Sequence, residues 1–354
     1  MKSIVLDETT RLEMERQHVA AWSAGIDERL HDCLQRNQGK SVSLTRYLSL
    51  LSSVPAERLL IMSVLEMRDL VRQVNHCLPK TNFYRKWKHP SAREALFAQV
   101  NKELSLIFDY DAFSRQAKDW NLGTLAMRLK KFIRICPYCN AETVYAYKVG
   151  AGIGRNAKGL GRFRILKSSF DHYFPKARYP FLAISLYNLI PSCTRCNTGA
   201  KGTGYEELLD VAHPYAVDDS GNPSEDMHRM MKFHVLPRSL RAFSCCEAND
   251  ISDVVLTERN PSGFSRGVKW ESVFGLNNAY TKLYREDAAD AMFKATHFSK
   301  SYVEALRKQL GAAGLSTDRL EKIVYGARLD ANAINVTRHG KMIIDTVEIF
   351  QGRG

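Results

Sequence analysis

Apolar residues at helical spacing dominate the first part of the chain. The clearest series steps by three and four residues, as one face of an α-helix does. Its members are Leu60, Val64, Met67, Val71, Val74 and Leu78. An earlier series with the same period consists of Val19, Trp22, Ile26, Leu30 and Cys33. Pro55 stands where a first helical turn tolerates proline. The pattern predicts helices that pack their apolar faces into a core.

The end of the chain shows the same period. Its apolar positions are Val303, Leu306, Leu310, Leu320 and Ile323. Gly311 can end the first of these helices, and Ser316 can cap the start of the second. We therefore predict a helical N-terminal region at 1–130 and a mainly helical C-terminal accessory region at 211–354.

The middle of the chain favours strands. Residues 143–149 are mostly β-branched or aromatic, and the glycines within 150–161 then break any regular element. Residues 162–170 are expected to return as a second strand. The acidic, proline-containing stretch 218–226 is typical of a surface loop, so the middle region is predicted to span 131–210. The predicted fold class is α+β, a mostly helical chain with a small central domain.

The composition is that of an ordinary globular protein. Of the 354 residues, 45% are hydrophobic and 25% are charged. No apolar run reaches the roughly 18 residues that a membrane span needs. The first ten residues also lack the basic start and apolar core of a secretion signal. We expect a cytoplasmic protein that does not contact membranes.

Positive charge is concentrated in the middle of the chain. Between Tyr145 and Tyr205 there are ten basic residues and one acid, Asp171, which accounts for nine of the 13 net positive charges. A run of charge is more often a solvated face than a binding site. Here the charge surrounds a candidate metal site, the cysteine pairs described below, and it therefore predicts contact with nucleic acid.

Four of the eight cysteines form two CxxC pairs, Cys136/Cys139 and Cys193/Cys196, separated by 53 residues. Two such pairs are the pattern of a tetrahedral four-cysteine zinc site. A closed shell of four thiolates leaves no position for water or substrate, so the zinc is expected to be structural. The remaining cysteines lack such partners and are interpreted as core or incidental thiols: Cys33, Cys77, Cys245 and Cys246.

Two alternative interpretations of the same segment are weaker. The first pair, Cys136-Pro137-Tyr138-Cys139, also resembles a glutaredoxin active site, but that chemistry needs a helix directly after the motif. A strand is expected there instead. Gly150, Gly152 and Gly154 resemble a dinucleotide-binding loop, but no amphipathic helix follows them.

A further ordered set of polar residues lies between and after the cysteine pairs. Asp171-His172 comes first and Asn188-Leu189 second. The second cysteine pair then continues into Asn197 and Lys201. In this order of motifs, residues 136–202 resemble zinc-containing HNH endonucleases of the bacterial ββα-metal type, over about a fifth of the chain.

The resemblance implies a β-hairpin and a helix that grip one divalent ion. His172 would be the general base that takes a proton from the attacking water. Asp171 and Asn197 would ligate the ion, and Asn188 would brace the loop that carries His172. Many relatives have histidine at the position of Asn197. With these oxygen ligands, Mg²⁺ or Mn²⁺ fits better than a softer ion.

Hydrolysis of a phosphodiester requires an activated water and neutralisation of the charge that develops on the phosphate. Basic neighbours would hold the flanking phosphates: Lys176, Arg178, Arg195 and Lys201. The sequence therefore predicts an HNH endonuclease that acts on nucleic acid, with DNA as the expected substrate. Some similar HNH proteins act in bacterial phage defence or restriction, sometimes beside an ATPase, and we expect that context here. The alternative is a zinc-stabilised scaffold that binds nucleic acid or protein without cleaving it, which predicts salt-sensitive binding without turnover.

Overall fold

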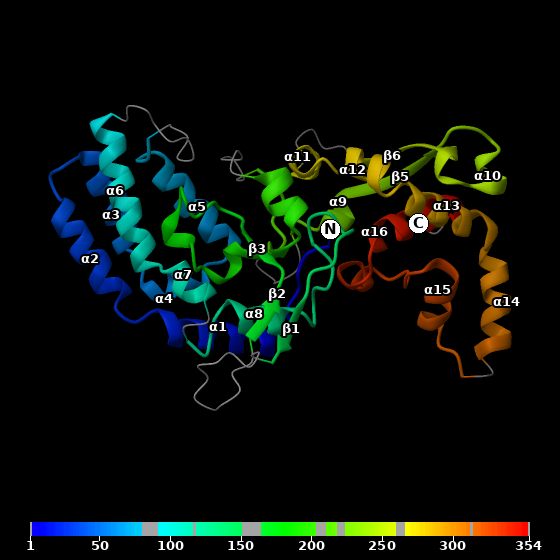
Figure 1. Ribbon diagram of the computed structural model, residues 1–354, viewed down its shortest axis with the longest axis horizontal. Helices are drawn as coiled ribbons and strands as arrows, with labels where there is room; N and C mark the ends of the chain where they lie inside the picture. The colour runs from blue at the N-terminus through cyan, green and yellow to red at the C-terminus, as the bar shows by residue number, and fades with distance from the viewer. Residues whose placement is uncertain are drawn as a thin grey trace.

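The computed structural model describes residues 2–79, 91–115, 118–150, 164–202, 210–217, 224–259, 266–311 and 314–352. The N-terminal helices form one end of an elongated molecule, and the C-terminal helices form the other (Figure 1). Small sheets lie between them, so the architecture is α+β. Among the described residues, no helix combines the length and the apolar character that crossing a membrane requires.

Among the described residues, eight helices occupy the N-terminal part. They are α1 (Glu8–Trp22), α2 (Ile26–Asn37), α3 (Val42–Ser52), α4 (Ala56–Ile61), α5 (Val64–Asn75), α6 (Ala92–Ile107), α7 (Tyr110–Ser114) and α8 (Leu122–Leu129). Pro55 directly precedes α4 at its N-cap, a position that needs no backbone N–H donor. The thiols of Cys33 and Cys77 are buried, as expected for core cysteines.

Each apolar series that predicted a single helix face is divided between two helices. Ser63 caps α5 through a capping box with Glu66, so the chain breaks between Leu60 and Met67. Gly25, at a φ of 73°, separates α1 from α2 in the same way. The apolar residues on both sides of each break are nevertheless buried, because the two halves face a common core. The apolar period therefore predicted which residues face the core, but it did not predict the breaks between the helices.

In the described ranges, three two-stranded antiparallel sheets follow one another along the chain. They pair β1 (Ala146–Val149) with β2 (Arg164–Lys167), β3 (Ser169–His172) with β4 (Leu189–Ser192), and β5 (Met231–Pro237) with β6 (Ile251–Glu258). The predicted hairpin is present as β1 and β2, while the end of the predicted return strand forms β3 and pairs with β4 instead. Of the glycines discussed above, those at 152–161 lie outside the described residues.

Short helical turns connect these strands, and longer helices complete the C-terminal part. The turns are η1 (Pro180–Leu182), η2 (Leu186–Asn188), the π-helix η3 (Arg195–Lys201), η4 (Ala248–Asp250) and η5 (Ala331–Val336). The helices are α9 (Met227–Met230), α10 (Ala242–Cys245), α11 (Arg266–Phe274), α12 (Leu276–Leu283), α13 (Arg285–His297), α14 (Lys300–Gly311), α15 (Thr317–Tyr325) and α16 (Gly340–Gln351). Gly311 ends α14 and Ser316 caps α15, as predicted.

The N-terminal segment reaches the middle of the molecule, where its end is marked in Figure 1. The backbone N–H of Ile4 donates to the carbonyl of Pro214 at 2.7 Å, and Asn335 Nδ2 donates to the carbonyl of Lys2 at 3.0 Å. One large hydrophobic cluster extends from Ile4 to Met342, and a smaller one joins α13 to α16. Both ends of the chain therefore support the central strands.

Candidate metal centre and the polar group beside it

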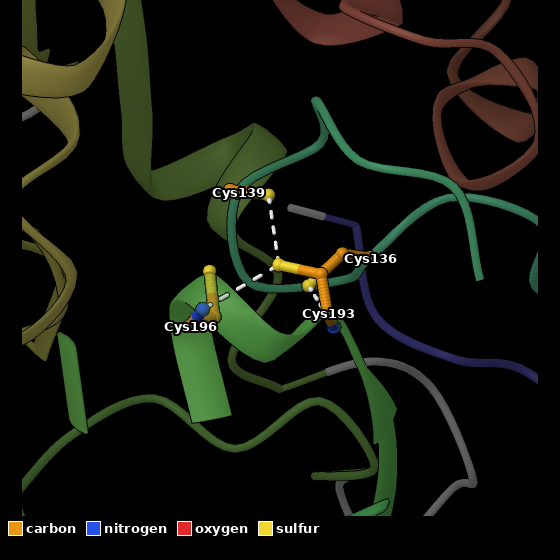
Figure 2. Close-up of side chains that lie close together, drawn as sticks. All are labelled: Cys136, Cys139, Cys193 and Cys196. Carbon is orange, nitrogen blue, oxygen red and sulfur yellow. Dashed lines mark hydrogen bonds between the residues drawn. The ribbon is translucent and has the colours of Figure 1, made fainter. Parts of the chain in front are cut away.

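The two CxxC pairs converge on one point (Figure 2). Cys136 and Cys139 come from the loop after α8, Cys193 follows β4, and Cys196 lies in the first turn of η3. The four sulfur atoms lie within 4.8 Å of one another, and all four cysteines are buried and free of disulfides. The prediction that the pairs form one cluster is confirmed.

The geometry of this cluster fits a tetrahedral metal ion such as zinc. A tetrahedron with Zn–S bonds of about 2.3 Å has sulfur–sulfur edges of about 3.8 Å, and the Sγ atoms of Cys139 and Cys193 are 3.9 Å apart. Backbone N–H groups point at the sulfurs, because Cys193 N lies 3.5 Å from Cys136 Sγ and Cys196 N lies 3.4 Å from Cys193 Sγ. Burial raises the pKa of the Cys136 thiol, whereas hydrogen bonding from Cys136 lowers the pKa of Cys139. Four buried cysteines so arranged can hold a metal ion.

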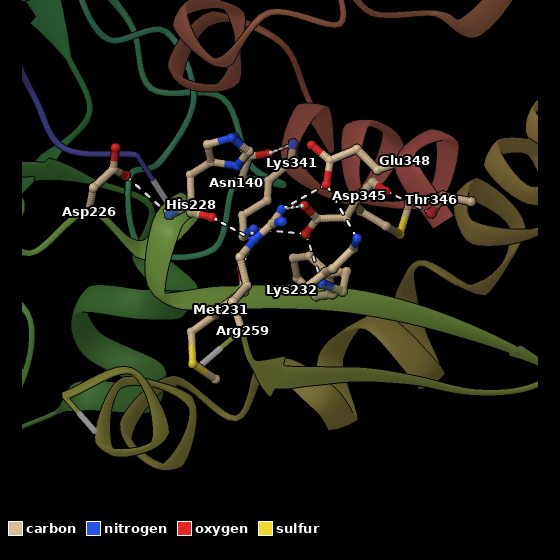
Figure 3. A network of polar contacts seen from close by, with 12 residues as sticks. Asn140, Asp226, His228, Met231, Lys232, Arg259, Lys341, Asp345, Thr346 and Glu348 are labelled. Carbon is tan, nitrogen blue, oxygen red and sulfur yellow. Dashed lines mark hydrogen bonds and ion pairs between the residues drawn. The ribbon is translucent and has the colours of Figure 1, made fainter. Parts of the chain in front are cut away.

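The turn after the first pair is fixed by Asn140. Its φ of 55° lies in the left-handed region, and its N–H closes the turn onto the carbonyl of Cys136 at 2.9 Å. Its side chain reaches the C-terminal part, where Oδ1 accepts from the backbone N–H of Lys341 at 2.9 Å. Lys341 Nζ donates to the carbonyl of Met231 at 2.6 Å and to Asp345 at 2.8 Å (Figure 3). The turn is thereby connected to β5 and α16 through a buried polar network.

Aromatic side chains of the C-terminal part also hold the first cysteine pair. Trp270 Nε1 donates to the carbonyl of Tyr138 at 3.0 Å, and the Tyr280 hydroxyl donates to the carbonyl of Cys139 at 2.8 Å. This arrangement also weighs against the glutaredoxin alternative, since residues 140–150, directly after Cys139, form no helix and both CxxC pairs share one cluster.

Asp171, on β3, is buried and already bonded to protein groups. Lys201 Nζ lies 2.6 Å from each carboxylate oxygen, and the hydroxyl of Tyr138 donates to Oδ2 at 2.6 Å. Burial lowers the pKa of Lys201, and the carboxylate of Asp171 opposes that shift. A carboxylate has about four lone-pair directions, so these contacts leave about one, on Oδ1, for a further partner.

His172 ends β3 and is oriented by a backbone carbonyl. Its Nε2 lies 2.9 Å from the carbonyl oxygen of Ala183, which can only accept, so Nε2 carries the proton and Nδ1 keeps its lone pair. The ring of Tyr110 meets the imidazole edge-on at a centroid distance of 4.5 Å. Burial and, secondarily, the charge of Lys176 lower the pKa of His172 to about 3. The imidazole is therefore neutral at pH 7.

Asn197 and Asn188 approach the same strand and the turn after it. Asn197 Nδ2 donates to the carbonyl of Phe170 at 3.4 Å, and its Oδ1 has no donor within the described ranges. Asn188 Oδ1 accepts from Phe174 N at 2.7 Å, and Nδ2 donates to the carbonyls of Phe174 and Leu182 at 3.0 and 2.9 Å. Asn188 thus joins the residues after His172 to those before Ala183. No hydrogen bond links Asp171, His172 and Asn197 directly in the part of the chain that is described.

The four basic residues assigned to phosphate contact differ in accessibility. Lys176 is exposed, with its ammonium 4.2 Å from the centre of the Tyr110 ring, and Arg195 is half-buried. Arg178 and Lys201 are buried, and Arg178 Nε donates to the Tyr179 hydroxyl at 3.0 Å. Sequence reasoning did not find Tyr138, Tyr110 or the Ala183 carbonyl as partners of Asp171 and His172, because these contacts join residues that are separated along the chain.

Comparison with known proteins gives two short matches. The chain is 40% identical over 53 residues to protein ea31 of Escherichia phage lambda, and 42% identical over 52 residues to the Septu protein PtuB of Bacillus thuringiensis. These segments make up 14% and 15% of this chain and 18% and 20% of the two relatives, so the chain spans about a fifth of the length of each. No family model and no solved structure matches.

Proposed function

We propose that the chain is a metal-dependent HNH-type endonuclease that hydrolyses phosphodiester bonds in nucleic acid, with DNA as its substrate and His172 as the general base. The observation that carries the proposal is the orientation of His172. The Ala183 carbonyl holds its Nε2–H, and no described residue hydrogen-bonds Nδ1, which can therefore accept a proton from water. With a pKa of about 3 the imidazole is neutral at pH 7, although this pKa is lower than the near-neutral value that suits a general base best.

The surroundings of His172 support the same proposal. Two antiparallel strands, β3 and β4, are followed by η3, which is the strand–strand–helix order of a ββα-metal core. On η3, Asn197 faces the carbonyl of Phe170, and Lys201 reaches the neighbouring Asp171. A four-cysteine metal site, with zinc as the expected ion, would join this helix to the loop after α8.

A catalytic Mg²⁺ or Mn²⁺ would be held by Asp171 Oδ1 and Asn197 Oδ1, each of which retains a lone pair among the described contacts. Such an ion would supply neutralisation of the charge that develops on the phosphate and on the leaving oxygen. The role of His172 is to take the proton of the attacking water on Nδ1. The role of Asn188 is to hold the two turns that orient the His172 ring.

The test is cleavage of plasmid DNA by the full chain in the presence of Mg²⁺ or Mn²⁺. Because general bases contribute roughly 10²–10⁴-fold to rate, His172→Ala should slow nicking at least about a hundredfold while metal content and folding are kept. His31→Ala, which removes an exposed imidazole on α2, is the matched control. Equal cleavage by His172→Ala would remove the assigned base. Failure of the unaltered chain to cut DNA or RNA would remove the nuclease assignment.

One observation favours a second candidate, a scaffold that binds without cleaving. The ammonium of Lys201 neutralises Asp171 in a buried ion pair, as expected if Asp171 serves the fold and binds no ion. The scaffold predicts salt-sensitive binding of nucleic acid with no products under any divalent ion.

We also propose that the chain works in phage defence. The match to the Septu protein PtuB supports this context, and an ATPase partner remains an expectation from the HNH resemblance. Plaque counts on cells that carry the chain, with and without its neighbouring genes, test it. Undiminished plaque formation in every combination would contradict the proposal.

A further inference from the structure

A polar groove of about 480 Å³ opens beside the four-cysteine cluster. Its walls come from the ends of β2 and β4, the start of β3, and the residues around Tyr145. The side chains that carry the argument are Tyr145, Lys167, Ser168, Ser192 and Arg195. The groove is separate from the surroundings of His172, since Ser169 and His172 are three residues apart on β3, about 10 Å along the strand.

The charged groups of the groove are suited to a phosphate backbone. Lys167 is half-buried, and its ammonium has no ion pair or hydrogen bond within the described ranges. Arg195 also lines the groove, but its Nε and Nη2 are buried from solvent and have no hydrogen-bond partner among the residues described. The single lining acid, Glu142, accepts a hydrogen bond from the hydroxyl of Tyr284 at 2.6 Å. Lys167 therefore retains unused donors toward the groove, and Arg195 adds positive charge to its wall.

Two exposed tyrosines stand at the rim of the groove. Tyr145 and Tyr147 lie two residues apart on the same edge. The two residues are 50% and 48% exposed, and their ring centroids are 5.7 Å apart. Tyr145 is fixed by its backbone, because its N–H donates to Ser168 Oγ at 2.9 Å and its carbonyl accepts from Ser168 N at 2.9 Å. Exposed aromatic rings beside a basic groove are the elements that bind unpaired bases by stacking.

We propose that this groove binds single-stranded nucleic acid, with phosphate against Lys167, positive charge from Arg195 in the wall, and bases stacked on Tyr145 and Tyr147. A duplex keeps its bases stacked inside, so it can offer phosphates to the groove but no base to the rings. The proposal deepens the nuclease function and rests on it for its role: an unpaired strand held here lies about 10 Å along β3 from His172. The proposed ligand is a single strand, and the test measures binding of single-stranded DNA and of single-stranded RNA separately.

The experiment is a binding measurement on the full chain with His172→Ala and no divalent ion, so that no turnover interferes. The probes are fluorescent oligonucleotides of roughly 20 nucleotides, longer than a site of about 4–16, each as a single strand and as a duplex. Each base stacked on a ring adds affinity. Because two rings are lost, the Tyr145→Ala/Tyr147→Ala double variant should weaken single-strand binding at least about thirtyfold while leaving the duplex almost unchanged. The Tyr145→Phe/Tyr147→Phe variant keeps both rings and should bind as the unaltered chain does.

Matched controls lie at the far end of the molecule, on α14 (Figure 1). Tyr302→Ala removes a tyrosine with 46% exposure, and Lys308→Gln removes an exposed ammonium. Lys167→Gln should lower the salt dependence of binding by about one phosphate contact, and Lys308→Gln should not. The proposal is overturned if the double alanine variant loses no affinity for single strands or loses as much for the duplex. If single-strand binding behaves as expected while the unaltered chain cuts no substrate, the groove stands and the nuclease function fails.

Discussion

The four-cysteine cluster and the polar group of Asp171, His172 and Asn197 share the same framework, since both use the β3–β4 pair and η3. The two sites differ in how many hydrogen bonds their side chains already make with other protein groups. The sulfurs point at one another and have few other donors. Asp171, in contrast, already binds Lys201 and Tyr138, and His172 is bonded to Ala183. The first site is arranged for a metal ion, whereas the second is partly filled by the protein's own groups.

This difference distinguishes a cluster that would stabilise the fold from a polar group that would carry out the proposed hydrolysis. An ion held by the four buried thiols would join β4, η3 and the loop after α8 directly, in addition to the hydrogen bonds described above. The polar group keeps its geometry without an ion, because Lys201 supplies positive charge at Asp171. We therefore expect metal loss to have a structural effect at the cluster, and substitutions at the polar group to have smaller, local effects.

The largest expected effect follows from removing one ligand of the cluster. Cys136→Ser should abolish stoichiometric zinc binding and destabilise the chain by at least about 5 kcal/mol, because structural zinc contributes about 10–16 kcal/mol in small domains. Metal analysis and thermal unfolding measure the two changes. Cys246→Ser, which removes a buried thiol outside the cluster, should keep the full zinc content. A Cys136→Ser protein with unchanged stability would show that the cluster does not hold the framework together.

The next effect concerns the ion pair beneath the polar group. Lys201 and Asp171 are buried, with side chains only 3% and 5% exposed, so Lys201→Met leaves a buried charge without its partner. Such a change costs about 3–5 kcal/mol. If Asp171 can accept a divalent ion, Mn²⁺ should restore part of that loss in denaturant unfolding.

The double variant Asp171→Asn/Lys201→Met is the matched control, because it removes both charges. It should be more stable than Lys201→Met and should not respond to Mn²⁺. If Mn²⁺ stabilised both variants equally, the ion would bind elsewhere, and Asp171 would lose its assignment as a ligand.

The sequence was sufficient for features that depend on spacing alone. The two CxxC pairs predicted one cluster, and the β-branched stretch at 143–149 predicted the hairpin that appears as β1 and β2. Ser316 was identified as a cap because a hydroxyl next to a helix start satisfies a free backbone N–H.

Features that depend on tertiary contacts were missed. The β5–β6 hairpin was not anticipated, although Met231, Phe233 and Val235 alternate with more exposed residues, as a half-buried strand requires. The pairing of Lys201 with Asp171 depends on the π-helical turn of η3, which no local pattern indicated. Lys201 had therefore been assigned to phosphate contact from charge alone, while in the folded chain its ammonium is buried.

A smaller effect compares two hydroxyls that hold the first cysteine pair. Tyr138 donates to a carboxylate and Tyr280 to a neutral carbonyl, at 2.6 and 2.8 Å. Hydrogen bonds to charged groups contribute about 1.5–3 kcal/mol and neutral ones about 1 kcal/mol. Tyr138→Phe should therefore lower the free energy of unfolding by about 2 kcal/mol, and Tyr280→Phe by about half as much. Equal losses would mean that the hydrogen bond to Asp171 is no stronger than the one to a neutral carbonyl.

The last prediction tests how far the support of the polar group extends. His18, on α1, donates its Nε2–H to the carbonyl of Ile184 at 2.7 Å, next to the carbonyl that orients His172, and its Nδ1 accepts from Trp120 at 3.0 Å. Burial lowers the pKa of His18 to about 4. The unfolded chain binds a proton at His18 below pH 6.5 that the folded chain does not. Stability should therefore fall as the pH drops from about 6.5 to about 4, by up to about 1.4 kcal/mol per pH unit.

His18→Gln removes that titration, so its stability should depend less steeply on pH across this window, even if the variant is less stable at pH 7. His31→Gln is the control for loss of an exposed histidine. The measurement is urea unfolding at several pH values, in which the slope against pH distinguishes a titrating side chain from a packing defect. If both variants keep the slope of the unaltered chain, His18 is not held neutral. The turn at Ala183 and Ile184 would then be positioned without α1, which would confine the support of His172 to the central strands.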